Sequence, residues 1–217
     1  TDNSVVFADE YIAPAGKNAP LIILFHQAGA NGRAVYDYAL PRFRAAGYSV
    51  LVVDQRSGGD RFGGTNRTVS KRGTSTEYCQ AYPDLEAAVN YAELQEYSGA
   101  VFAAGSSYSA GLVVRLGAEY GDMLNGVIAF SPAAGGPMKN CSPNSYADDT
   151  NTPILLVRPD KEMAIPSVKD QFTLFERAGH TMFVHKDGVH GASTLDTART
   201  DNNSEPAWTA LAAFLAE

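Results

Sequence analysis

The stretch AVFAAGSSYSAGLVVRLG, residues 100–117, decides the fold. It begins with a short apolar run, Ala100–Ala104, which predicts a buried strand. The residues Leu112–Tyr120 that follow have the apolar pattern of a helix. Only a turn of small residues separates the two, so strand passes almost directly into helix. We expect Ser107 to be raised above the strand ends at this sharp turn.

The residues around Ser107 match the nucleophile-elbow pattern, in which a serine has small residues two positions away on either side. Gly105 and Ser109 occupy those positions. The helix after the turn directs its positive end toward the place where negative charge develops during acyl transfer. Such a match also arises by chance in a chain with 20 glycines, and the alternative is an ordinary Gly/Ser turn that caps a helix. Ser109 is the alternative nucleophile if the turn is shifted by two residues.

Strand-like runs alternate with helical patterns along the chain. The expected strands are Val5–Phe7, Tyr11–Ala13, Leu21–Phe25, Tyr48–Val53, Ala100–Ala104, Val127–Phe130, Ile154–Val157 and Thr181–His185. The expected helices are Arg33–Ala46, Asp84–Glu96, Tyr108–Tyr120, Ser167–Ala178 and Pro206–Ala216. Several strand runs are hydrophobic throughout, as in strands buried on both faces of a parallel sheet. The sequence predicts an α/β fold, a doubly wound and mostly parallel sheet of about seven to eight strands flanked by helices.

Two long irregular stretches, Gln55–Tyr82 and Ser131–Thr152, each follow a predicted strand. Both should lie over the carboxyl edge of the sheet, where open α/β folds bind ligands. The second is too short and polar for a substantial helical cap, so we expect one domain over residues 1–217 with an open site. The first contains a basic segment, residues 56–72, which we interpret as a solvated loop. A groove that steers an anionic substrate is the alternative.

His190 is the best candidate for a base that activates Ser107. It lies in a glycine-flanked loop beyond the last strand, which can curl over the carboxyl edge. His180 precedes that strand and should lie at the opposite edge. His185 closes the strand and is interpreted as a structural histidine, as is His26.

The base needs a carboxylate that fixes its tautomer. Asp160 and Glu162 both follow the strand Ile154–Val157, so either one satisfies the chain order of nucleophile, acid and base. The developing oxyanion needs two backbone donors. We expect the amides of Tyr108 and Gln27 to supply them, with Ala28 as the alternative to Gln27.

These residues together resemble the α/β-hydrolase superfamily over nearly the whole chain. The matching landmarks are Phe25–Gly29, Gly47–Tyr48, Val50–Gly58, Gly105–Ala110 and His190–Gly191. The size and the lack of a cap resemble the small serine esterases grouped with dienelactone hydrolases, which implies hydrolysis of esters, lactones or thioesters without a cofactor. Dienelactone hydrolases proper have a cysteine where this chain has Ser107, which favours a general carboxylesterase. The family's acid, usually Asp, stands four residues before a proline, and here that residue is Glu162, before Pro166.

Composition and the cysteines limit which partners the protein can bind and indicate its cellular compartment. The chain of 217 residues has a net charge of −7, which argues against nucleic acid, and no apolar run is long enough to span a membrane. Cys79 and Cys141 lie in polar loops without a metal motif, so we expect a disulfide and an oxidising compartment. Glycosylation patterns begin at Asn66 and Asn202. We expect a secreted or periplasmic protein, with a cytoplasmic one as the alternative.

The leading hypothesis is a serine hydrolase that cleaves carboxylic esters through an acyl-enzyme, using Ser107, His190 and Glu162. Asp160 is the alternative acid. The expected substrate is a small-molecule ester or an accessible polymeric one, and no cofactor or metal is expected. The alternatives are a non-catalytic binding module that retains the fold, and a lactone or thioester hydrolase.

Overall fold

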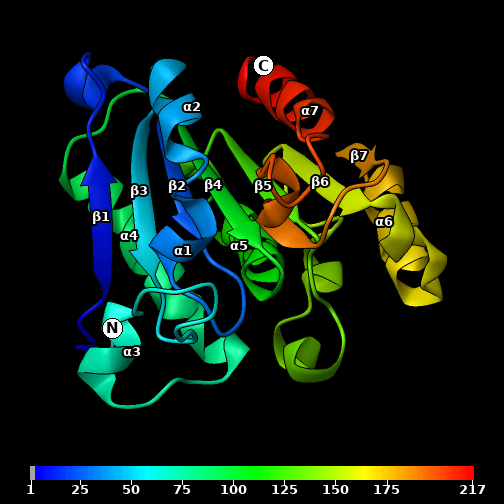
Figure 1. The fold of residues 1–217 in the computed structure, drawn as a ribbon, viewed down its shortest axis with the longest axis horizontal. Coiled ribbons are helices and arrows are strands. Elements are labelled where there is room, and N and C mark those ends of the chain that lie inside the picture. The colour runs from blue at the N-terminus through cyan, green and yellow to red at the C-terminus, as the bar shows by residue number, and fades with distance from the viewer. Residues whose placement is uncertain (1–2) are drawn as a thin grey trace.

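The computed structural model describes residues 3–217, which contain one seven-stranded sheet. The strands are β1 (Phe7–Tyr11), β2 (Leu21–Phe25), β3 (Ser49–Asp54), β4 (Val101–Ser106), β5 (Gly126–Phe130), β6 (Ile154–Pro159) and β7 (Thr181–His185). Their order across the sheet is β1-β3-β2-β4-β5-β6-β7 (Figure 1). Strand β1 lies at the edge and pairs antiparallel with β3, and all the other pairs are parallel. The predicted doubly wound, mostly parallel sheet is confirmed.

Helices cover both faces of the sheet. They are α1 (Gly32–Tyr36), α2 (Leu40–Ala45), α3 (Arg67–Arg72), α4 (Tyr82–Leu94), α5 (Tyr108–Glu119), α6 (Pro166–Arg177) and α7 (Glu205–Leu215). Ile22 and Leu24 of β2 pack in one core with α1, α2 and α7, whereas Leu21, Ile23 and Phe25 pack in another with α4, α5 and α6. Burial on both faces explains why β2 is hydrophobic throughout. Within the described residues no helix is long and apolar enough to cross a membrane.

Two expected elements differ from the structure. The pattern Arg33–Ala46 predicts one helix, but the chain forms two, α1 and α2. Pro41 lies at the start of α2, where its missing N–H and its ring prevent an earlier helix from continuing. Near the N-terminal end, the expected strands Val5–Phe7 and Tyr11–Ala13 are replaced by the single edge strand β1.

A disulfide joins the irregular segments that follow β3 and β5. It links Cys79 with Cys141 across a sequence separation of 62, as their place in polar loops predicts. Cys79 lies in the 3-10 turn Tyr78–Ala81, and Cys141 ends the 3-10 turn Gly136–Cys141. In the chain-entropy model, closing a loop of this length stabilises the folded state by about 4 kcal/mol.

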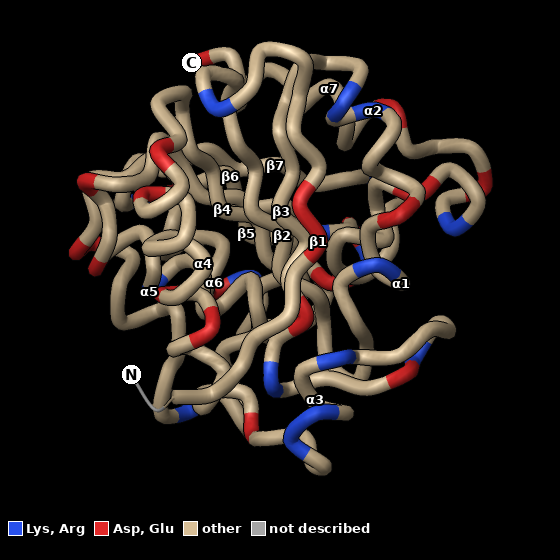
Figure 2. Tube along the Cα trace, turned by 90° about the vertical axis from the view of Figure 1, so that its left-hand side faces the viewer, with Lys and Arg blue, Asp and Glu red and all other residues tan. Residues whose placement is uncertain are grey.

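Two arginines of the basic segment after β3 are paired within the fold. Arg56 forms a buried ion pair with Asp84, and the partly exposed Arg67 pairs with both Asp54 and Asp9. Arg56 is therefore an exception to the interpretation of this segment as a solvated loop, whereas Arg61, Lys71 and Arg72 are exposed. Figure 2 shows α3, with its Lys and Arg positions in blue, below β1.

Candidate active site

Ser107 lies at a strained turn between β4 and α5. Its φ of 60° is in the left-handed region, which is unusual for a residue with a side chain. Hydrogen bonds from Ser107 N to Phe130 O (2.9 Å) and from Ala133 N to Ser107 O (3.1 Å) hold the turn. A Cβ atom at Gly105 would lie 2.4 Å from the Ser109 carbonyl oxygen, so only glycine fits there. The expected strand-to-helix turn is present, and Ser107 lines a cavity above it.

A chain of hydrogen bonds connects Ser107, His190 and Glu162. The Ser107 Oγ and His190 Nε2 atoms are 3.0 Å apart, and His190 Nδ1 is 2.5 Å from Glu162 Oε1. Glu162 lies in the turn Asp160–Ala164 after β6, and His190 directly precedes the turn Gly191–Leu195 after β7. An ionised carboxylate only accepts hydrogen bonds, so Nδ1 of His190 carries the proton and Nε2 is free to accept one from Ser107. This is the geometry a histidine needs in order to remove a proton from a serine hydroxyl.

Glu162 divides its two oxygens between different partners. Oε1 accepts from His190, and Oε2 accepts from Arg158 Nη1 at 2.7 Å. Arg158 is buried at the end of β6, and its Nη2 donates to Pro132 O and to Gln171 Oε1. Burial alone would raise the pKa of Glu162, but the hydrogen bonds from His190 and Arg158 and their charges outweigh it and hold the pKa below its ordinary value. The carboxylate therefore stays ionised at neutral pH.

Asp160 is engaged elsewhere. Its Oδ1 accepts from the amides of Lys161 (2.8 Å) and Asp187 (3.2 Å), and thereby fastens the turn after β7 to the end of β6. The structure makes no hydrogen bond between Asp160 and His190. Of the two candidate acids, Glu162 is the one beside the histidine.

Two of the three candidate oxyanion donors line the same cavity as Ser107, and the third adjoins Ser107 in the chain. Gln27 and Ala28 line it, and Tyr108 follows Ser107 at the start of α5. The Gln27 carbonyl accepts from His26 Nδ1 at 2.9 Å, and because the peptide is trans, the Ala28 N–H points away from His26. Within residues 3–217 the amides of Gln27, Ala28 and Tyr108 have no hydrogen-bond acceptor. Gln27 and Ala28 both remain candidates for the second donor.

Ser106 connects the loops on the two sides of Ser107, a role that the sequence analysis missed. Its Oγ donates to Gln27 Oε1 (3.0 Å) and accepts from the Ala192 amide (2.9 Å). A Cβ atom at Gly191 would lie 2.3 Å from this oxygen, which explains the glycine after His190. No signal in the sequence points to this contact, because it joins three segments that are distant along the chain.

Ser109 fills the second small position of the turn with a buried hydroxyl. Its Oγ donates to His26 O and accepts from Gln55 Nε2, both at 2.6 Å. The structure places no histidine nitrogen within hydrogen-bond distance of it in the described residues. Ser109 is therefore a packing residue, and the alternative register of the turn does not occur.

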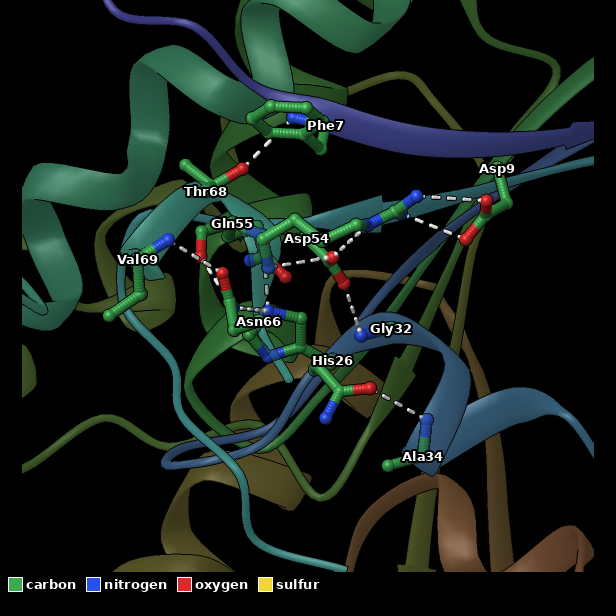
Figure 3. A network of polar contacts seen from close by, with 12 residues as sticks. Phe7, Asp9, His26, Gly32, Ala34, Asp54, Gln55, Asn66, Thr68 and Val69 are labelled. Atoms are coloured by element: carbon green, nitrogen blue, oxygen red, sulfur yellow. Dashed lines mark hydrogen bonds and ion pairs between the residues drawn. The ribbon is translucent and has the colours of Figure 1, made fainter. Parts of the chain in front are cut away.

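His26 bonds to the Gln27 carbonyl on one side and to Gln55 and Asn66 on the other, and the second set of contacts is drawn in Figure 3. It is completely buried, and its Nε2 accepts from the Gln55 amide and from Asn66 Nδ2, each at 3.1 Å. Burial lowers the pKa of His26 below its ordinary value, so the ring is neutral. The Asn66 side chain is itself buried and caps α3, so the glycosylation pattern at Asn66 is not an accessible site.

The two remaining histidines make their hydrogen bonds away from Ser107. His185 is buried at the end of β7 and bonds to Thr194 Oγ1 and Asn203 O. His180 precedes β7 and bonds to Ala147 O at 2.9 Å. Neither contacts Ser107.

The cavity above Ser107 has a volume of about 310 Å³ and is open to solvent. Ser107, His190, Gln27 and Ala28 are among the residues that line it. We call the lining residues that the sequence analysis did not assign to the site the rim. They are Arg61, Phe62, Val189, Ser193 and Arg199.

The fold and this geometry define an α/β hydrolase. The chain belongs to the family described as serine aminopeptidase, S33, whose model matches residues 16–157. The expected membership of the α/β-hydrolase superfamily is thus confirmed. No curated protein sequence matches the chain significantly.

Solved structures of esterases have the same fold. Est1E from Butyrivibrio proteoclasticus, with bound ferulic acid, is 15% identical with a TM-score of 0.67, and the match covers 95% of this chain and 96% of that one. A putative dienelactone hydrolase from Klebsiella pneumoniae is 17% identical with a TM-score of 0.67 and coverages of 98% and 99%. A carboxyl esterase from Bacillus coagulans is 13% identical with a TM-score of 0.70 and coverages of 96% and 94%. At these identities the likeness establishes the fold.

Proposed function

We propose that the protein is a serine hydrolase that cleaves carboxylic esters through an acyl-enzyme intermediate. The observation that carries the proposal is the unbroken chain of hydrogen bonds from Ser107 through His190 to Glu162. Two further observations support the proposal. Ser107 itself lies at a strained turn, and within residues 3–217 the amides of Gln27, Ala28 and Tyr108 have no hydrogen-bond acceptor.

In the first half of the reaction, Ser107 Oγ attacks the ester carbonyl while His190 Nε2 removes the hydroxyl proton. Glu162 stabilises the resulting imidazolium. The negative charge that develops on the carbonyl oxygen is held by the Tyr108 amide and by the amide of Gln27 or Ala28. Collapse of the tetrahedral intermediate breaks the bond to the alcohol, which takes the proton from His190.

In the second half, water enters after the alcohol has left. His190 removes a proton from the water as it attacks the acyl carbon, and the same donors hold the oxyanion. Collapse then breaks the bond to Ser107 Oγ, which recovers its proton from His190. A carboxylic acid is released, and no cofactor takes part.

The proposed substrates are small esters or accessible polymeric ones, since the cavity is open and we propose a single domain without a cap. Lactones and thioesters fit the same chemistry. The disulfide supports a secreted or periplasmic location, because disulfides persist in oxidising compartments.

An aminopeptidase is the second candidate, because the family description names that activity. Recognition of a substrate's amino terminus requires a negative group near the nucleophile. Among the described residues no Asp or Glu lines the cavity, whereas two arginines do. Ester cleavage is therefore the better-supported activity.

The test compares hydrolysis of p-nitrophenyl acetate and butyrate by the wild type and by Ser107→Ala. We expect kcat to fall on the order of 10⁶-fold in the variant, while Ser70→Ala, an exposed serine on α3, retains activity. Faster turnover of amino-acid p-nitroanilides than of the esters would favour the aminopeptidase. If neither class is hydrolysed and a fluorophosphonate does not label the protein, a binding module becomes the better account.

A further inference from the structure

Two arginines from distant parts of the chain line the cavity above Ser107. Arg61 belongs to the loop after β3, and Arg199 follows the segment that carries His190. Their guanidinium carbons lie 5.0 Å and 4.1 Å from the centre of the same aromatic ring, that of Phe62. Among the described residues no acidic side chain lines this cavity. The described residues that line the cavity therefore include two cations and no anion, in a protein whose net charge is −7.

The two guanidinium groups still have hydrogen-bonding capacity. Within residues 3–217 Arg61 has no carboxylate partner, and its guanidinium group packs against the Phe62 ring. Arg199 is held by Asp196, with 3.2 Å between Nε and Oδ2, and by Ser193 Oγ, 3.0 Å from Nη1. These contacts orient Arg199 and leave its Nη2 without a partner in the described chain.

The loop that carries Arg61 is attached to the loop of the candidate oxyanion donors. The Arg61 amide donates to Gly29 O at 2.9 Å, and the Gly59 amide donates to Ala30 O at 2.8 Å. Asn31 Nδ2 completes the link by donating to Gly63 O at 2.9 Å. These bonds fix the backbone of Arg61 relative to the loop of Gln27 and Ala28. A residue that selects substrate needs such a fixed position.

Phe62 is a second sign that this rim serves recognition. Its φ of 71° is in the left-handed region, a genuine outlier for an aromatic residue, and the side chain is 42% exposed. The ring gives both cations a favourable face and keeps them near each other. Two like charges held close together repel, and a bound anion relieves that repulsion.

We propose that Arg61 and Arg199 form a carboxylate subsite, so that the preferred substrate is an ester that also carries a carboxylate. A planar guanidinium pairs with a carboxylate through two parallel hydrogen bonds, which gives geometric selectivity as well as attraction. A cavity of about 310 Å³ accommodates such a small ester. This inference rests on the proposed esterase function, because it concerns the same cavity.

The test measures kcat/KM for two pairs of esters that differ in charge. In the first pair the carboxylate is on the acyl side, mono-4-nitrophenyl glutarate against its neutral methyl ester. In the second it is on the alcohol side, 3-carboxyphenyl butyrate against its neutral methyl ester. We expect the wild type to prefer the anionic ester at least about tenfold in one pair, as a charge-assisted contact would give. The pair that shows the preference reveals which side of the ester meets the arginines.

Variants connect the preference to the subsite. Arg61→Gln should reduce the anionic-to-neutral ratio about tenfold and weaken its salt dependence, and Arg61→Lys should retain part of it. Arg177→Gln, an exposed arginine at the far end of α6, makes the same change in net charge and should leave the ratio unchanged. A wild type that hydrolyses the neutral esters as fast as the anionic ones in both pairs would overturn the subsite and leave the esterase intact. Failure to hydrolyse all four esters would instead overturn the proposed function.

Discussion

Two buried ion pairs in this protein are built from the same groups and arranged differently. The side chains of Arg56 and Asp84 are 6% and 0% exposed, and those of Arg158 and Glu162 are 5% and 15% exposed. Arg56 donates hydrogen bonds to Asp84 from its amide, Nε and Nη2, and these bonds occupy both carboxylate oxygens. Glu162 gives Arg158 one oxygen and gives His190 the other.

The difference shows what each pair is for. Removing two charges from water is costly, so a buried pair needs good geometry to be tolerated. Asp84 lies in the first turn of α4, and Arg56 follows β3. Their ion pair, in which Arg56 uses both oxygens of Asp84, therefore fixes the helix to the sheet. In the Arg158–Glu162 pair the arginine uses only one carboxylate oxygen, Oε2. The other oxygen, Oε1, bonds to His190, whose charge changes during the proposed reaction. Three predictions test this comparison, from the largest expected effect to the smallest.

Glu162→Gln should abolish most activity, and it should also lower the free energy of unfolding, because it leaves the buried Arg158 without a counter-charge. The amide that replaces Oε1 can donate to His190 Nδ1 and so favour the wrong tautomer. We expect kcat to fall roughly 10⁴-fold for an ester that the wild type hydrolyses. Glu176→Gln, an exposed residue on α6, is the matched control. Near-normal kcat in Glu162→Gln would mean that Asp160 or no acid at all supports the histidine.

Asp84→Asn should lower stability without lowering kcat. It leaves the buried Arg56 without a counter-charge, so we expect the free energy of unfolding to fall by about 3–5 kcal/mol. Urea titration followed by the fluorescence of Trp208, the single and buried tryptophan, measures it. Below the unfolding transition, kcat should stay close to that of the wild type. A variant of unchanged stability and lost activity would place this pair in the reaction instead.

Substitution of Arg158 separates its charge from its geometry. Arg158→Met removes the cation that lowers the pKa of Glu162. The effect of burial, which raises this pKa, is then less compensated, so the pKa of Glu162 rises from its depressed value. The folded-state pKa of Glu162 is now below its ordinary value, so its contribution to stability is present above that value and is lost as pH falls through the folded pKa. The acid limb of the stability profile, the pH range over which the folded state loses stability on acidification, should therefore move to higher pH in Arg158→Met.

Arg158→Lys retains the charge but cannot reach Glu162, Pro132 and Gln171 together. We expect about a tenfold loss in kcat with little displacement of the acid limb. Thermal melts of both variants separate loss of folded protein from loss of turnover. Acid limbs that coincide in wild type and Arg158→Met would show that this arginine does not influence Glu162.

The sequence was sufficient for those features that depend on local pattern. The alternation of apolar runs predicted the sheet, and the Gly105–Ala110 turn predicted where Ser107 lies. The split of the helix after β2 was within reach as well, because Pro41 carries the signal.

Features that depend on distant partners were beyond it. Asp160 and Glu162 are two residues apart in one 3-10 turn, and only the folded chain decides that Asp160 meets the Asp187 amide while Glu162 meets His190. In the same way nothing local identifies Ser106 as the link between two loops. Arg61 stood out only as one member of a basic segment, and its place on the rim depends on the contacts between its loop and Gly29.

The most direct test is to find which residue of the protein a serine-directed reagent modifies. The wild type is treated with a fluorophosphonate, its intact mass is measured, and the modified peptide is sequenced by mass spectrometry. The account predicts one label per chain on Ser107 and strongly slowed labelling in His190→Ala, which lacks the base. A label on another residue, or a protein that hydrolyses esters and takes no label, would contradict it.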